Sequence, residues 1–141
     1  MTCSWCNRTH DGGPEHCIRG VVLVCGGRDY SNWTRVLAVL DKVAARVEMT
    51  TVRHGAARGA DSLADRWAHY RGFAPDPFPA DWQAWAAAHP GERPNRAGFE
   101  RNELMATTAP VPVLCVAFPG GNGTADMVSR AEAHGIRVWA L

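Results

Sequence analysis

The sequence lacks a surplus of charge of either sign, and it has no apolar run long enough to cross a membrane. Its 141 residues carry 15 Lys or Arg and 14 Asp or Glu, so the formal net charge is +1. Nothing in this balance favours nucleic acid or an acidic membrane surface as a partner. No signal-peptide pattern or low-complexity tract is present either, so we expect a single domain of ordinary size in the cytoplasm.

Cysteine is unevenly distributed, because three of the five cysteines lie in the first 17 residues. That segment is polar and has neither helical nor strand periodicity, so we expect residues 1–18 to form a separate unit from residues 19–141. In a reducing compartment, crowded cysteines favour a metal over disulfides. The order of residues approximates that of a zinc knuckle and predicts a structural zinc ion bound by Cys3, Cys6, His10 and Cys17. His16 competes with His10, and reduced thiols without metal are the alternative.

From residue 21 the pattern alternates between apolar strands and helical segments. Strands are expected at 21–25, 50–54, 111–118 and 136–141, with a proline-broken edge strand at 73–78 at best. Helices are expected after residue 31, over 61–70, 81–89 and 95–108, and from residue 124 to 134. This alternation predicts an α/β fold with a doubly wound, mainly parallel sheet.

Glycine-containing loops follow three of the expected strands. They are Gly26-Gly27-Arg28, the segment from Gly55 to Asp61, and the segment from Pro119 to Thr124. Loops after the carboxyl ends of parallel strands line a common crevice. A strand, a glycine-rich turn and a helix N-terminus together favour an anion, most often a phosphate. A tight turn that binds nothing is the alternative for any one loop.

Several segments together resemble the YspA-like branch of the SLOG superfamily, which joins the LOG phosphoribohydrolases with the DNA-processing protein DprA. The matching segments are Cys25 to Tyr30, His54 to Asp61, Ala80 to Trp82, Arg101-Asn102, and Phe118 to Met127. The resemblance covers everything after the N-terminal cysteine segment. It implies a Rossmann-like fold that binds a nucleotide or a nucleotide-derived ligand.

The candidate ligand-binding residues come from these loops and segments. They are Gly26, Gly27, Arg28, Gly55, Arg58, Gly59, Asp61, Arg101, Asn102, Pro119, Gly120, Gly121, Gly123 and Thr124. A planar guanidinium suits phosphate, although surface arginines are common. Asp61 suits a ribose hydroxyl or a water molecule, or it is a helix N-cap. Trp82 and Trp85 suit a base or a contact in a homo-oligomer, with core packing as the alternative.

The resemblance to LOG enzymes also suggests catalytic residues. The segment Glu100 to Met105 is similar to their Glu-Arg-Lys segment, which places the catalytic arginine at Arg101 and puts Asn102 where the lysine stands. Asp61 is the second catalytic candidate. The catalytic Glu of those enzymes falls at Met127, and methionine can neither stabilise a ribosyl cation nor activate water.

The first hypothesis is therefore a sensor or sequestering module for a nucleotide-derived ligand. The enzyme alternative is a nucleoside-monophosphate phosphoribohydrolase that uses Arg101 with Asp61, Glu103 or Asp126. A third hypothesis is DprA-like binding of single-stranded DNA, aided by the zinc knuckle. The near-neutral charge argues against that third function.

Overall fold

A computed structural model describes residues 18–93 and 96–141 of the chain. Its centre is one five-stranded sheet, in which all strands run parallel in the order β3-β2-β1-β4-β5. The strands are β1 (Ile18–Cys25), β2 (Val47–His54), β3 (Ala74–Pro77), β4 (Leu114–Ala117) and β5 (Arg137–Ala140). The chain builds one half outward from β1 to β3 and then returns to add β4 and β5. This is the order of a Rossmann-like sheet, as the alternation of segments predicts.

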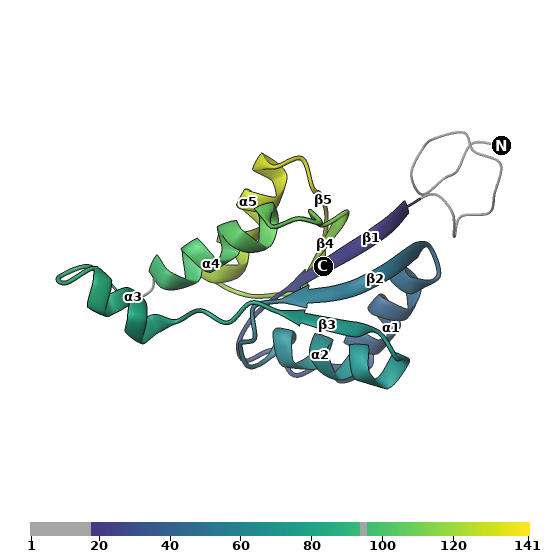
Figure 1. Ribbon diagram of the computed structural model, residues 1–141. Helices are drawn as coiled ribbons and strands as arrows, with labels where there is room; N and C mark the ends of the chain where they lie inside the picture. Colours follow the sequence, from purple (N-terminus) through teal and green to yellow (C-terminus); the bar gives the residue numbers. More distant parts are fainter. Residues whose placement is uncertain (1–17, 94–95) are drawn as a thin grey trace.

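Helices cover both faces of the sheet (Figure 1). One face carries α1 (Trp33–Ala44) and α2 (Ala60–Arg71), and the other carries α4 (Arg96–Thr107) and α5 (Asn122–Ala133). The short helix α3 (Trp82–Ala88) lies beyond the carboxyl ends of the strands, next to α4. The chain reaches α3 directly from β3, which is an edge strand with prolines at positions 75 and 77. The proline-broken segment is thus an edge strand, as expected.

Two helix starts differ from those expected. Helix α2 begins at Ala60 with Gly59 as its N-cap, so Asp61 lies inside the first turn and is not the cap. Gly59 has φ +79°, a conformation that favours glycine over the capping residues Ser or Asp. Helix α5 begins at Asn122 rather than at Thr124. In both helices the residue expected as the cap therefore lies within the first turn.

Two kinds of feature are missing from residues 18–93 and 96–141. No helix there is long and apolar enough to span a bilayer, and no three His, Cys, Asp or Glu side chains are grouped as metal ligands. The zinc site predicted at Cys3, Cys6, His10 and Cys17 lies outside these residues.

Candidate functional site

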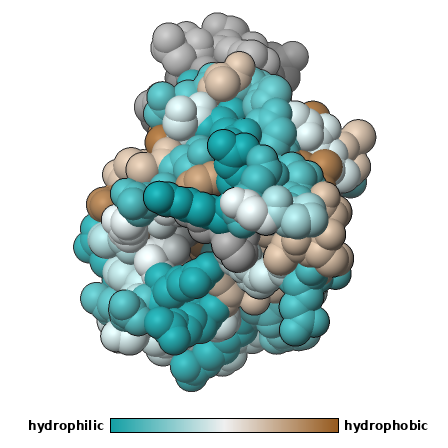
Figure 2. All heavy atoms as spheres, turned by 90° about the vertical axis from the view of Figure 1, so that its left-hand side faces the viewer, coloured by the Kyte–Doolittle hydropathy of each residue, from teal (hydrophilic) through white to brown (hydrophobic). Residues whose placement is uncertain are grey.

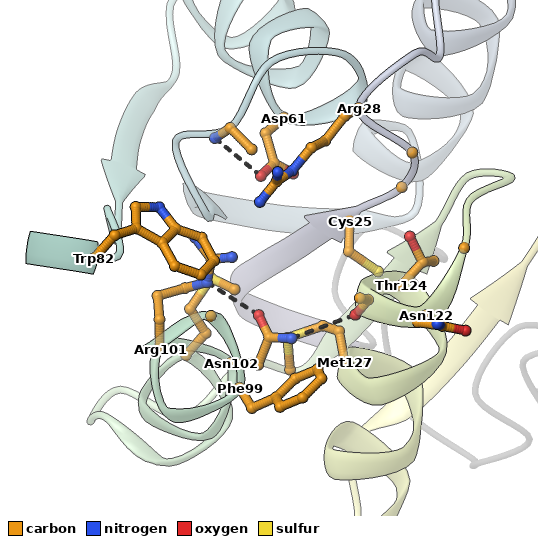
Figure 3. A pocket seen from close by; sticks show the side chains of 17 residues that line it. Cys25, Arg28, Asp61, Trp82, Phe99, Arg101, Asn102, Asn122, Thr124 and Met127 are labelled. Carbon is orange, nitrogen blue, oxygen red and sulfur yellow. Dashed lines mark hydrogen bonds between the residues drawn. The ribbon is translucent and has the colours of Figure 1, made fainter. Parts of the chain in front are cut away.

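A cavity of about 370 Å³ opens where β1 and β4 end side by side. The chain reverses its strand order at this point, and parallel sheets bind their ligands there. Figure 2 views the molecule from this end and shows hydrophilic side chains on both sides of a hollow. We call it the switch-point cavity; it is lined by Cys25, Gly26, Gly27, Arg28, Ala57, Asp61, Trp82, Gly98, Phe99, Arg101, Asn102, Met105, Gly121, Asn122, Gly123, Thr124 and Met127 (Figure 3).

The three glycine loops are locked together beside the cavity. The Gly27 amide donates to the Pro119 carbonyl at 2.9 Å, and the Ala60 amide donates to the Gly27 carbonyl at 3.0 Å. A Cβ on Gly59 would lie 2.2 Å from the Gly27 oxygen, and one on Gly120 would lie 2.6 Å from the Gly27 nitrogen. Gly59, Pro119 and Gly120 therefore hold the loops against one another and do not line the cavity.

The first turn of α5 forms one wall of the switch-point cavity. Gly121, Asn122, Gly123 and Thr124 all line it. The first N–H groups of a helix have no partner within the helix, and the helix dipole is positive there. This wall is therefore suited to an anionic group, which is the chemistry predicted from the glycine loop.

Asp61 lies on the opposite wall and is 8% exposed. Its Oδ2 accepts the Ala57 amide at 3.2 Å, and burial is the main cause that raises the pKa of its carboxyl group. The neighbouring His54 has a structural role. Its Nδ1 accepts the Ala56 amide at 3.0 Å, so its Nε2 donates to Asp65 at 2.7 Å.

Arg101 faces Asp61 across Gly55. Its Nη1 donates to the carbonyl oxygens of Gly55 and Phe78. A Cβ on Gly55 would lie 2.6 Å from that Nη1 and 3.0 Å from Asp61 Oδ2, so only glycine leaves room for both groups. Burial lowers the pKa of Arg101, and the Asp61 carboxylate opposes this shift. The structure thus brings the two candidate catalytic residues together at the rim of the cavity.

Asn102 uses both polar atoms of its side chain to join α4 to α5 (Figure 3). Its Oδ1 accepts Arg101 Nε at 3.0 Å, and its Nδ2 lies 3.0 Å from Asp126 Oδ2 and 3.3 Å from the Gly123 oxygen. Asp126 also accepts Arg130 Nε at 2.9 Å. Asn102 therefore lines the cavity but acts first as a link that orients Arg101.

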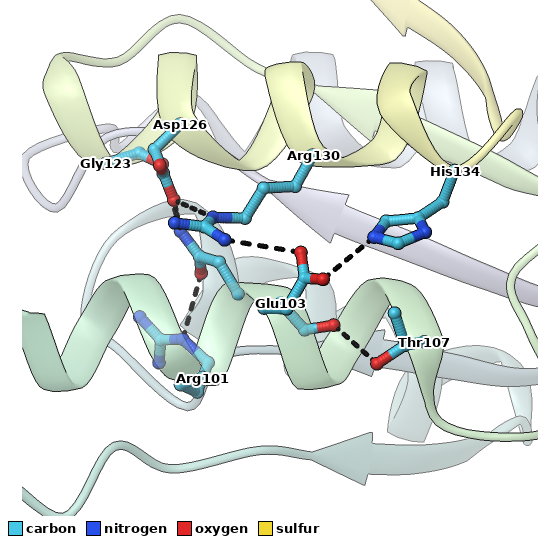
Figure 4. Close-up of polar contacts among 8 residues, drawn as sticks. Arg101, Glu103, Thr107, Gly123, Asp126, Arg130 and His134 are labelled. Carbon is cyan, nitrogen blue, oxygen red and sulfur yellow. Dashed lines mark hydrogen bonds and ion pairs between the residues drawn. The ribbon is translucent and has the colours of Figure 1, made fainter.

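Two acids proposed as catalytic alternatives do not line the cavity. Glu103 accepts Arg130 Nη1 at 3.2 Å and pairs with His134 Nε2 at 2.9 Å, on the outer side of the α4–α5 contact (Figure 4). Asp126 is held by Asn102 and Arg130, as described above. The position corresponding to the LOG glutamate is Met127, which is 1% exposed and lines the cavity as an apolar side chain.

A second cavity, of about 360 Å³, adjoins the first. We call it the arginine cavity; it is lined by Arg28, Gly55, Ala56, Ala57, Arg58, Pro79, Ala80, Trp82 and Arg101. Four of these residues, namely Arg28, Ala57, Trp82 and Arg101, line both cavities. The predicted residues Gly55 and Arg58 therefore belong to this second part of the site.

The two tryptophans of α3 have different roles. Trp82 is 36% exposed and stands at the border of the two cavities, with Arg28 Cζ 5.6 Å from its ring centroid. Trp85 is buried, stacks on His89 and donates its indole N–H to Glu100 at 2.8 Å. Core packing therefore accounts for Trp85, while Trp82 is available to a ligand.

Sequence reasoning missed the apolar wall of the switch-point cavity. Phe99 and Met105, one turn and a half apart on α4, line it together with Cys25 and Met127. The composition of residues 95–108 predicted a helix, but it did not separate a face that lines a cavity from a face that packs in the core. The proximity of Phe99 to Arg101 in the chain was the one available signal.

Comparisons with known proteins agree with this geometry. The sequence pattern of the YspA, cpYpsA-related SLOG family matches residues 20–85. The chain is also similar to the Gene 61 protein of Mycobacterium phage D29, with 36% identity over 126 residues, covering 83% of this chain and 92% of the phage protein. The matched residues run from β1 into α3 and include Arg28, Asp61 and Trp82.

Proposed function

Because the chain belongs to the YspA, cpYpsA-related SLOG family, we propose that the switch-point cavity binds a nucleotide or a nucleotide-derived ligand. The protein then acts as a sensor of that ligand or as a module that sequesters it. The observation that carries this proposal is the pairing of two walls in one cavity. A helix terminus suited to an anion at residues 121–124 and apolar side chains that include Phe99 and Met127 line the same cavity.

Each wall suits one part of a nucleotide. A phosphate at the α5 N-terminus would accept the free N–H groups and meet the positive end of the helix dipole. A base would lie against Phe99 and Trp82, whose rings offer stacking surfaces. The volume of about 370 Å³ lies within the range of sites for small organic ligands.

Binding without hydrolysis is supported by the side chain at position 127. Met127 has no proton to transfer and no charge with which to stabilise a ribosyl cation. Asp126, its neighbour, is engaged by Asn102 and Arg130 rather than directed into the cavity. The expected role is therefore recognition of a ligand, not its cleavage.

Calorimetric titration with AMP tests the proposal. We expect saturable binding by the wild-type protein and a loss of about tenfold or more in affinity for Thr124→Glu, which puts a negative charge at the anion wall. Ser129→Glu, on an exposed turn of the same helix, is the matched control and should bind normally. Absence of heat or thermal stabilisation with AMP, ADP-ribose, NAD and cyclic nucleotides would contradict the proposal.

One observation favours the enzyme alternative. Asp61 is a buried carboxyl group whose pKa is raised by burial, and Arg101 lies across Gly55 from it. Such a pair is typical of acid–base sites. Incubation with nucleoside monophosphates, followed by chromatography, distinguishes the two functions. If the wild-type protein releases free base and the Arg101→Lys and Asp61→Asn variants do not, the protein is a phosphoribohydrolase. Intact nucleotide supports binding alone.

Single-stranded DNA binding is the weakest of the three functions. A DprA-like role needs a basic groove along the strand, but the chain has a net charge of +1. We expect no mobility shift of labelled single strands even at low salt, and a shift there would favour this function.

The zinc prediction is a separate proposal that depends only on the sequence. With Cys3, Cys6, His10 and Cys17 as ligands, protein purified without chelator should contain about one zinc ion per chain. Elemental analysis measures this directly. His10→Ala should lose the metal and His16→Ala should keep it; the reverse result would show that His16 is the ligand. Zinc far below one ion per chain would contradict the site.

A further inference from the structure

The arginine cavity has a one-sided charge. Arg28, Arg58 and Arg101 all line it, and no carboxylate is among its lining residues. Asp61 lies on the far side of Gly55, and Asp29 meets Arg58 from outside. Asp81, between the lining residues Ala80 and Trp82, accepts the Ala84 amide. Three guanidinium groups around about 360 Å³ of open space repel one another unless an anion lies between them.

The ion pair between Arg58 and Asp29, which partly neutralises this cavity, is weak. Arg58 Nη2 lies 3.4 Å from Asp29 Oδ1, and the two side chains are 75% and 95% exposed. Exposed pairs of this kind contribute little and exchange readily with water. Arg58 is therefore free to turn to a stronger anionic partner without loss to the fold.

The backbone beside these arginines is also unusual. Ala56 has φ +56°, a left-handed conformation that is uncommon for a residue with a Cβ. The Ala56 and Ala57 amides are bound to His54 and Asp61, which keep the loop in this conformation. The loop that carries Arg58 is thus held in place before any ligand arrives.

We propose that the two cavities form one site for a nucleotide that carries a second phosphate group, with one phosphate at the α5 N-terminus and the other among Arg28, Arg58 and Arg101. This inference rests on the proposed function and names its ligand class. The base would lie against Trp82, which lines both cavities. A nucleoside monophosphate fills only the first cavity and leaves the three arginines without an anion.

The test compares AMP with ADP and adenosine 3′,5′-bisphosphate by calorimetry at fixed ionic strength. We expect at least one of the two doubly phosphorylated ligands to bind about tenfold more tightly than AMP, since a charge-assisted hydrogen bond contributes about this factor. If AMP binds as tightly as ADP and adenosine 3′,5′-bisphosphate, the inference is overturned and the proposed function stays intact. Binding of none of the three would overturn both.

Two substitutions of opposite effect locate the second phosphate. Arg58→Gln should remove most of the advantage of the doubly phosphorylated ligand, so that its affinity falls toward that of AMP. Asp29→Asn releases Arg58 and should tighten that ligand about two- to threefold. Arg35→Gln, an exposed arginine of α1 that lines neither cavity, is the control and should change nothing. Equal losses for AMP and the doubly phosphorylated ligand in Arg58→Gln would contradict the assignment.

Discussion

The two faces of the sheet differ in how their helices meet it. On the side of α1 and α2, buried apolar side chains from both helices and from β1, β2 and β4 form a continuous core around Trp67. On the side of α4 and α5, the core is smaller, and the cavity separates the beginnings of the two helices. The same sheet thus has one closed face and one face that is open at its carboxyl end.

This difference assigns separate tasks to the two halves. The closed face supplies the burial of apolar surface that stabilises the fold. On the open face, polar links take the place of core, and the Asn102–Asp126–Arg130 chain keeps α4 and α5 together beside the cavity (Figure 4). Substitutions on the closed face should therefore reduce stability, and substitutions on the open face should reduce ligand affinity.

The largest effect is expected for Trp67→Ala on the closed face. Trp67 is fully buried, stacks on Phe73 and donates its indole N–H to Asp41 at 2.9 Å. Its truncation should lower the free energy of unfolding by about 3–5 kcal/mol. Met127→Ala, which enlarges a cavity that already exists, should cost about 2 kcal/mol. Urea unfolding measures both, and a larger loss for Met127→Ala would reverse the comparison.

A matched pair of exposed aromatic residues tests ligand binding. Trp82 borders both cavities, while Tyr70 is 65% exposed on α2. Trp82→Ala should weaken AMP binding by about 1–3 kcal/mol, the usual contribution of base stacking. Tyr70→Ala should leave the affinity unchanged. Calorimetry on both variants decides the point, and equal affinities would remove Trp82 from the binding site.

The buried carboxyl group of Asp61, which lies in the first turn of α2 and lines the switch-point cavity, should give a distinctive pH dependence. Burial raises the pKa of Asp61 above its ordinary value of 3.8 in the unfolded chain, so the folded chain binds more protons between the two values. The wild-type free energy of unfolding should therefore fall, relative to that of Asp61→Asn, as the pH rises through this window. Urea unfolding from pH 3 to 8 measures the free energy of unfolding of both proteins. A difference between them that does not change with pH would show that burial does not raise the pKa of Asp61.

The smallest effects are expected at two surface carboxylates, one on each face. Hydrogen bonds from Arg71 lower the pKa of Asp41, and hydrogen bonds from His134 lower the pKa of Glu103. Each contributes stability that is present above its unfolded pKa and is lost as the pH falls through its folded pKa. Asp41→Asn and Glu103→Gln should therefore each lower the free energy of unfolding slightly at neutral pH, and their difference from wild type should shrink as the pH falls. If one of the two substitutions lowers the free energy of unfolding much more than the other, surface charge rather than packing distinguishes the two faces.

Much of the fold was predictable because its signals are local. Apolar runs bounded by glycine or proline gave the strands, and the Rossmann-like alternation followed from their order. Helix starts were less accurate, since Gly59 caps α2 by its backbone conformation, which no side chain signals.

The candidate site was predictable only on its polar side. The three glycine loops and the arginines were visible as motifs, and the structure brings Arg28, Asp61 and Arg101 together. The apolar wall at Phe99 and Met105 was not visible, because only the three-dimensional arrangement separates a cavity wall from a core. The interlocking of Gly59 and Gly120 with Gly27 likewise depends on contacts between distant loops.

Hydrogen exchange with and without AMP tests the central claim, that the open face holds a nucleotide at the strand ends. Saturating AMP should slow exchange in peptides that cover residues 24–28, 98–106 and 119–127, because these segments line the switch-point cavity. Exchange in α1, on the closed face, should stay unchanged. Unchanged exchange at residues 119–127 under saturation, or protection confined to α1 and α2, would contradict the account.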